Sequence, residues 1–265
     1  DGTVASDPDN EKFLHNEIGA NFGTNKLGVR VSAYNTDWLD RNLTKSVETG
    51  QGSSGDTDII FLKGVNQKHQ GLEIETKVKP NELVELDLIA SFGNWKFDGD
   101  ANGTYQEMEY NDEGQVIGQT STEYSYALDG LYVGDMPQTA YILGVTLKPV
   151  KGLRLQALYK TYDKNYSDWS PAAREIEDGE ADRAQVWEAP GYSKLDLHAS
   201  YKLPIKGHDI SLTAHVFNAL DEVFVQDAVD NSRYNGFGSK EHLPHNAEVF
   251  LGTPRYANIG VSINF

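Results

Sequence analysis

What the sequence lacks already excludes several classes of protein. The chain of 265 residues contains no cysteine, so it holds no disulfide, thiolate metal site or cysteine nucleophile. Its apolar stretches, such as residues 140–147, fall far short of the roughly 18 to 20 residues that a membrane-spanning helix requires. Basic residues are scarce, with 23 Lys and Arg against 40 Asp and Glu and a formal net charge of -17, and we expect no nucleic-acid partner.

Recognised catalytic patterns are also missing. The sequence has no phosphate-binding glycine loop and no His-Glu-x-x-His motif. Asp, Glu and His are common enough in polar segments for a Ser-His-Asp triple to be assembled by choice, so such a triple has little weight. We therefore predict that the chain is not an enzyme and needs no cofactor, with a membrane-embedded hydrolase as a poor alternative.

The carboxyl terminus carries the clearest pattern. Phe265, Ile263, Val261, Ile259 and Ala257 alternate with polar or small residues. Successive side chains of a strand point to opposite faces, so this segment predicts a strand with one apolar and one polar face. Its length matches the roughly 9 to 11 residues with which a tilted strand crosses a bilayer.

The same two-residue period recurs along the chain and predicts nine strands in all. They lie at about residues 18–22, 27–34, 72–78, 84–92, 141–148, 153–160, 194–203, 209–216 and 256–265.

Short and long connections alternate between these strands. The short ones contain turn residues and lie at 23–25, 79–82, 148–152 and 203–208. The long ones span about residues 39–70, 95–138, 163–191 and 219–254. Outer-membrane barrels have short periplasmic turns and longer extracellular loops. The pattern predicts an all-β, antiparallel transmembrane β-barrel meander, and a soluble β-sandwich binding module remains an alternative.

The odd number of strands is a problem for a closed barrel. Single-chain bacterial barrels have even numbers of strands, and an open sheet edge is not tolerated in lipid. Either one strand has been missed, for instance around Asp58 to Leu62, or further strands belong to sequence outside this chain. We interpret residues 1–265 as the carboxyl-terminal part of a larger barrel.

Several motifs resemble those of one family. Leu212-Thr-Ala-His-Val-Phe-Asn-Ala-Leu-Asp-Glu222 and Gly252-Thr-Pro-Arg255 before the last strand resemble the end of TonB-dependent outer-membrane receptors, as does the run from Gly191 to Tyr201. Gly71-Leu-Glu-Ile-Glu75 and Ala33-Tyr-Asn-Thr-Asp37 are similar to strand motifs of the same family. Each motif is weak alone, but their order and spacing make the resemblance fairly specific.

The resemblance implies a plugged barrel of 22 strands in the bacterial outer membrane. The implied function is import of a scarce ligand, such as a ferric siderophore, cobalamin or glycan; the alternative is a passive porin or small closed barrel. The implied partners are the lipid bilayer and lipopolysaccharide, the remaining N-terminal strands and plug, and the TonB system. The barrel assembly machinery would read the terminal pattern of Phe265, Ile263, Val261 and Ile259. No segment here resembles the plug, so energised transport belongs to the whole protein.

Acidic residues gather in the long connections. The last three hold 23 of the 40 acidic residues and 6 of the 23 basic ones. Such loops are either a solvated face, bridged by divalent cations to lipopolysaccharide, or attract a cationic or metal-bearing ligand. His242, His245 and Glu248 are weak metal candidates because their spacing is irregular, and we expect no metal site. The inward strand faces carry charges of both signs, which we expect to pair across the wall.

Aromatic residues divide into two groups. Those near strand ends, such as Tyr159 and Tyr201, are typical of the girdles at a membrane interface. Those within the long connections either stack on a ligand or pack the loops against one another. The candidates for ligand contact are Tyr166, Trp169, Trp187, Tyr192, Phe224, Tyr234 and Phe237.

Overall fold

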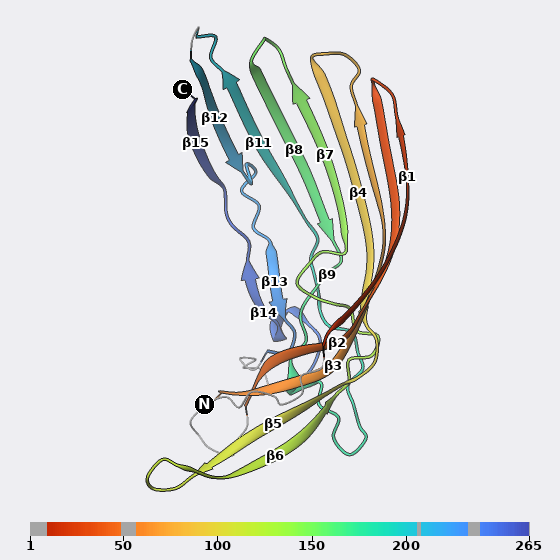
Figure 1. The fold of residues 1–265 in the computed structure, drawn as a ribbon, viewed down its shortest axis with the longest axis vertical. Helices are drawn as coiled ribbons and strands as arrows, with labels where there is room; N and C mark the ends of the chain where they lie inside the picture. The colour runs from red at the N-terminus through yellow and green to blue at the C-terminus, as the bar shows by residue number, and fades with distance from the viewer. Residues whose placement is uncertain (1–9, 49–56, 206–207, 233–238, 265) are drawn as a thin grey trace.

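Nine long strands form one antiparallel meander. The computed structural model describes residues 10–48, 57–205, 208–232 and 239–264. Each of the nine predicted strands is confirmed (Figure 1). In order across the sheet they are β1 (Lys12–Gly23), β2 (Leu27–Glu48), β3 (Thr57–Val78), β4 (Val84–Phe97), β7 (Thr139–Leu147), β8 (Leu153–Asp163), β11 (Tyr192–Lys202), β12 (Asp209–Phe217) and β15 (Tyr256–Asn264).

The meander has two outer strands among the described residues. The pairing path runs from β1 to β15, and within the described ranges each of these two strands pairs on one side alone. All the described helices are too short or too polar to cross a membrane.

The two ends of the meander differ. Four short turns gather at one end, while the longer connections and their added elements lie at the other (Figure 1). The long connections contain three further strand pairs and two short helices: β5 (Ala101–Tyr110) with β6 (Val116–Tyr126), β9 (Asn165–Tyr166) with β10 (Glu188–Ala189), β13 (Val225–Val229) with β14 (Glu248–Leu251), η1 (Pro171–Ala173) and η2 (Pro244–Asn246).

The predicted loop at residues 39–70 is wrong in its bounds. β2 continues to Glu48 and β3 begins at Thr57, so most of this range is strand. Two register shifts around Arg41 interrupt the ladder, and Asp40 has a φ of 57°. A bulge of this kind breaks the two-residue period, which hides the outer halves of both strands from the sequence pattern. Residues 58–62 lie within β3 and add no tenth strand.

Burial along the strands is inverted relative to a water-soluble protein. Apolar side chains of the convex face are exposed, including Leu143 at 44% and Val261 at 63%. Polar side chains of the opposite face are buried, including Thr146 at 0% and Asp196 at 4%. An apolar outer face and a polar inner face are what a barrel wall in lipid requires.

Two of the sequence motifs meet across the β2–β3 pair. Tyr34 of β2 is the register partner of Gly71 of β3, and its ring lies over the glycine. A Cβ atom at Gly71 would come within 2.4 Å of the Tyr34 ring. The Tyr34 hydroxyl accepts a hydrogen bond of 2.9 Å from Trp95 Nε1 on β4. The glycine therefore makes room for an aromatic side chain that ties three strands together.

The two motifs near the carboxyl terminus also meet. Asn218 Nδ2 donates hydrogen bonds to the carbonyl oxygens of Glu222 (2.9 Å) and Thr253 (3.3 Å). Asp221 Oδ1 accepts the Arg255 N–H at 2.9 Å, and the Arg255 guanidinium lies 3.5 Å from its carboxylate. These contacts join the exit of β12 to the entry of β15, so both motifs shape one end of the last hairpin.

Candidate functional site

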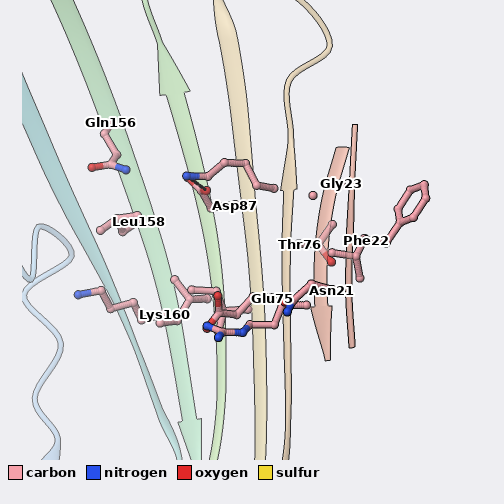
Figure 2. A pocket seen from close by; sticks show the side chains of 15 residues that line it. Asn21, Phe22, Gly23, Glu75, Thr76, Asp87, Gln156, Leu158 and Lys160 are labelled. Atoms are coloured by element: carbon pink, nitrogen blue, oxygen red, sulfur yellow. Dashed lines mark ion pairs between the residues drawn. The ribbon is translucent and has the colours of Figure 1, made fainter. Parts of the chain in front are cut away.

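The inner face of the meander forms the first part of the site. A hollow of about 750 Å³ lies between β1, β2, β3, β4, β7 and β8. Figure 2 shows Glu75, Asp87 and Lys160 from separate strands at this hollow, while the ring of Phe22 extends away from the other labelled side chains. The concave wall is therefore lined by charged groups supplied by several strands.

Ion pairs across the wall bear out the expected pairing of inward charges. Lys148 Nζ lies 2.6 Å from Glu85 Oε1, and Lys160 Nζ lies 2.7 Å from Asp196 Oδ2. The latter carboxylate also accepts the backbone N–H of Asn218 at 2.8 Å through Oδ1. Because both carboxylates are largely buried, these pairs are shielded from water better than surface ion pairs are.

The wall also contains an apolar strip that the sequence pattern did not reveal. Ile89, Ile142 and Leu158 line the hollow beside the charged residues. Ile89 and Ile142 are direct register partners on β4 and β7. Alternation assigns side chains to faces but does not require every inward residue to be polar. The register of the strands is needed to show that the inward apolar residues of neighbouring strands lie side by side.

The second part of the site is a packed layer built from the long connections. Its core is a hydrophobic cluster that joins the outer half of β3 to the later loops. The members are Ile60, Leu62, Val65, Phe97, Ala101, Tyr126, Leu128, Leu131, Tyr166, Trp169 and Val186. The long connections thus form a folded layer with its own hydrophobic core rather than a set of independent loops.

Two of the predicted ligand-contacting aromatics lie inside this core. Trp169 is 1% exposed, and its ring lies 5.6 Å from that of Tyr126. Tyr166 is 8% exposed and stacks on Tyr132 with the ring centroids 4.1 Å apart. These positions give both side chains a part in holding the loop layer together.

The other predicted aromatics lie elsewhere. Phe224 is buried at 6% and stacks on Tyr192 at 4.2 Å, with Lys194 Nζ 4.8 Å from its ring centroid. Trp187 is half-buried beside Val186. Tyr234 and Phe237 lie outside the described residues. Trp187 and Tyr192 are therefore the two predicted aromatics that are half-buried rather than buried among those that the structure describes.

A buried charge network ties two of the loops together. Arg174 is 0% exposed and donates through Nη1 to the carbonyl oxygens of Asp182 (3.1 Å) and Ala184 (2.7 Å). Its Nη2 lies 3.4 Å from Asp230 Oδ2. His242 Nδ1 lies 2.5 Å from the same oxygen, and His242 Nε2 lies 3.0 Å from Asp182 Oδ2. His242 therefore bridges two carboxylates from different connections.

The two carboxylates favour the charged form of this histidine. The hydrogen bond to Asp230 raises the pKa of His242 against the opposing effect of burial, with further contributions from the charge of Asp230 and the bond to Asp182. Burial alone would raise the pKa of Asp182, but the Ala184 N–H and His242 together lower it. The network is thus most stable with an imidazolium between two carboxylates.

Two other carboxyl groups in the loop layer have raised pKa values. Burial and the nearby carboxylate of Asp227 raise the pKa of Asp135. Burial also raises the pKa of Asp168, although Lys45 forms an ion pair with it. The removal of both carboxyl groups from water therefore disfavours their charged form.

The weak metal candidates make different contacts. His242 joins the network above, His245 lies 4.0 Å from Glu241, and Glu248 accepts a hydrogen bond of 2.7 Å from Ser232 Oγ. Among the residues that the structure describes, no group of three or more His, Asp or Glu side chains could hold a metal ion.

Sequence reasoning missed the buried arginine at the centre of this network. Arg174 is one of six basic residues in the three acidic connections. This scarcity of basic residues was the one feature of the sequence that pointed to a special role for Arg174. A lone arginine among carboxylates is as compatible with an exposed ion pair as with a buried anchor, so its place required the structure.

Comparisons with known proteins agree with this architecture. The family described as "TonB dependent receptor-like, beta-barrel" matches residues 8–219. Among solved structures, the copper transporter OprC aligns with 99% of this chain and 32% of its own, with a TM-score of 0.58 and 14% identity. The ferric-catecholate import receptor Fiu from E. coli K12, in its closed form, aligns with 96% of this chain and 28% of its own, with a TM-score of 0.52 and 12% identity. No curated protein matches the chain.

These findings settle the family. The chain spans about a third of the length of the two solved structures, and at such low identity their likeness concerns the fold. The match to the family over residues 8–219 covers most of the sequence, including eight of the nine meander strands. The single curved sheet, with exposed apolar and buried polar faces, also leaves no place for the two-layer sandwich alternative. The chain belongs to the TonB-dependent receptor β-barrel family.

Proposed function

We propose that this chain forms part of the barrel wall and the extracellular loop layer of a TonB-dependent transporter in the bacterial outer membrane. The transporter imports a scarce ligand such as a ferric siderophore, cobalamin or glycan. The observation that carries the proposal is the pairing of a polar, ion-paired inner wall with a folded acidic loop layer at one end. A passive pore needs the wall but has no need of so large a packed layer over one mouth.

The proposal assigns residues 1–265 to the carboxyl-terminal portion of the barrel. Support comes from the two outer strands of the described meander and from the one-third coverage of the solved relatives. Further strands would pair with the outer edges of β1 and β15, and a plug would contact the hollow beside Ile89, Ile142 and Leu158. The TonB system would act through the part of the protein that carries the plug.

Ligand contact is proposed for the loop aromatics that remain reachable. Trp187 is half-buried in the loop layer, and Tyr234 and Phe237 are retained from the sequence prediction. A flat ring offers stacking area for a catechol, a corrin or a sugar. The acidic surface would favour a cationic or metal-bearing ligand, and it would also bind divalent cations that bridge to lipopolysaccharide.

Two features fit the other proposed partners. The exposed apolar face of the strands would lie against the lipid bilayer. The terminal pattern of Phe265, Ile263, Val261 and Ile259 would be read by the barrel assembly machinery; the last three are exposed on β15, and Phe265 lies outside the described residues.

Dependence on TonB tests the proposed function. The complete protein would be expressed in cells with and without a functional TonB gene. Uptake of radiolabelled ferric catecholate, cobalamin and maltodextrin would then be measured at low external concentration. We expect at least one probe to accumulate, and its uptake to fall to the background of non-expressing cells when TonB is absent. Uptake that is the same in both strains would identify a passive pore and overturn the proposal.

Substitution of Trp187 separates ligand contact from transport. Trp187→Ala should raise the concentration of the accepted probe needed for half-maximal uptake while leaving the folded protein in the membrane. The matched control is Tyr141→Ala, because Tyr141 is an aromatic residue exposed on the outer face of β7. An equal effect of both substitutions would remove Trp187 from the proposed contact surface.

A further inference from the structure

Two histidines face each other on the inner wall, one on each of two neighbouring strands. His198 of β11 and His215 of β12 are direct register partners. Their Nδ1 atoms lie 2.8 Å apart, and both side chains are half-buried. They line a second hollow of about 390 Å³, together with Gln156 and Phe217. We propose that these two imidazoles form a binding site for a divalent copper ion on the lumenal wall.

The spacing of the two nitrogens fits metal chelation. An Nδ1 to Nδ1 distance of 2.8 Å corresponds to a hydrogen bond that shares at most one proton. Two imidazole nitrogens bound at about 2.0 Å to one ion lie about 2.8 Å apart when they subtend a right angle, and about 3.3 Å apart in a tetrahedron. Right angles belong to the square-planar and tetragonal sites preferred by Cu²⁺, whereas Zn²⁺ prefers the tetrahedron. The distance between the two nitrogens can therefore stay the same when copper replaces the shared proton, while both rings turn so that their lone pairs converge on the ion.

The two rings are held in place by their neighbours. Phe217 packs edge-on against His198, with the ring centroids 5.4 Å apart, and lies 6.0 Å from His215. Phe217 stacks in turn on Tyr256 of β15 at 4.7 Å. A pair of ligands that is already positioned loses less side-chain freedom on binding an ion, which strengthens the site.

Further ligand atoms lie in the same row of the sheet. Gln156 of β8 is the register partner of His198 on its other side, and Asn258 of β15 is the partner of His215. The order across four neighbouring strands is therefore amide, imidazole, imidazole, amide. Amide and water oxygens can fill the remaining positions of a tetragonal copper site, which accepts both nitrogen and oxygen ligands.

The surrounding charges set the strength of the site. Asp196 lies two residues before His198, but its two carboxylate oxygens are already occupied by Lys160 and by the Asn218 N–H. Arg154 also lines the hollow, and its guanidinium donates to Thr146 Oγ1 at 3.3 Å. With one arginine nearby and no available carboxylate among these neighbours, we expect a site of moderate affinity that releases its ion readily.

Copper titration of the complete purified protein tests the proposal. Calorimetry and electron paramagnetic resonance with Cu²⁺ would be carried out on the wild type, His198→Ala, His215→Ala and the control His208→Ala. His208 is exposed beside the β11–β12 turn and lies outside the hollow. The wild type and the control should bind one Cu²⁺ with two nitrogens in its equatorial plane. Each of the other two variants should bind at least tenfold more weakly and lose a nitrogen from the resonance spectrum.

The same copper titration can also refute the proposed site. Copper affinity and nitrogen coordination that are unchanged in both His198→Ala and His215→Ala would overturn the site. Heat-modifiable migration on gels would verify that each variant is folded, and His198→Gln and His215→Gln provide second variants of closer size. The site depends neither on the identity of the imported ligand nor on TonB, so its failure would leave the proposed function intact.

Discussion

At the scale of single residues, the contact between Tyr34 and Gly71 explains why two separate motifs occur in this sequence. Tyr34 covers the glycine and its hydroxyl accepts a hydrogen bond from Trp95, so one side chain contacts three strands. Gly71 has no need here of an unusual backbone angle, because the space above its Cα atom is what the tyrosine requires. The two motifs therefore occur together because the tyrosine of β2 needs the glycine of β3 in order to pack against that strand.

Replacing this glycine should weaken the wall. Gly71→Ala would place a Cβ atom 2.4 Å from the Tyr34 ring, displace the ring and disturb its bond to Trp95. Such overpacking costs about 1 to 3 kcal/mol. The urea midpoint of the complete protein in detergent should fall for Gly71→Ala but not for Gly28→Ala, whose added Cβ would meet nothing within 4 Å. Equal midpoints for the two variants would refute this role.

A pH dependence should arise from His242. Its pKa is raised mainly by the hydrogen bond to Asp230, so the stability it contributes is complete below the unfolded pKa of about 6.5. That contribution is lost as the pH rises through the higher pKa of the folded state. Above it, Nε2 carries no proton for Asp182 while Nδ1 remains bonded to Asp230.

Hydrogen exchange of the loop layer would detect this change. Protection of residues 239–248 should decrease as the pH rises above about 6.5, after correction for the intrinsic exchange rate. His242→Gln should remove the pH dependence, and His208→Gln, at the opposite end of the sheet, should retain it. A profile that is unaffected by His242→Gln would contradict the assigned network.

At the scale of elements, the sequence predicted the strands far better than the connections. All nine meander strands follow from alternation, because lipid on one side and a polar interior on the other impose a two-residue period. The outer halves of β2 and β3 escaped notice because the bulge around Arg41 changes the register. The burial of Trp169 and Arg174 could not be predicted, because their partners come from distant segments that only the folded loop layer brings together.

The last strand permits a direct test of which face meets lipid. Val261 is 63% exposed on the outer face of β15, and the adjacent Ser262 lies on the other face. An arginine at the bilayer midplane facing lipid costs about 2 to 4 kcal/mol. Val261→Arg should therefore reduce the amount of folded protein in the outer membrane much more than Ser262→Arg, as measured by heat-modifiable migration of membrane fractions. Equal losses would mean that the two faces are wrongly assigned.

At the scale of the whole molecule, the meander separates two environments. Short turns lie at one end, and the acidic loop layer with its own apolar core lies at the other (Figure 1). In a receptor barrel this places the loop layer outside the cell and the turns in the periplasm. The arrangement joins a surface suited to ligand capture to a wall suited to passage, which is the central claim for this chain.

The most direct test is cysteine labelling in intact cells, because the chain contains no cysteine of its own. Glu113 lies in the β5–β6 turn of the loop layer, and Asn81 lies in the short turn between β3 and β4. Each residue would be replaced by cysteine in a separate variant, Glu113→Cys and Asn81→Cys. With a membrane-impermeant maleimide, the account predicts that Glu113→Cys is labelled in intact cells and that Asn81→Cys is labelled after the outer membrane is permeabilised. Labelling of Asn81→Cys in intact cells, or recovery of the protein in the soluble fraction, would contradict it.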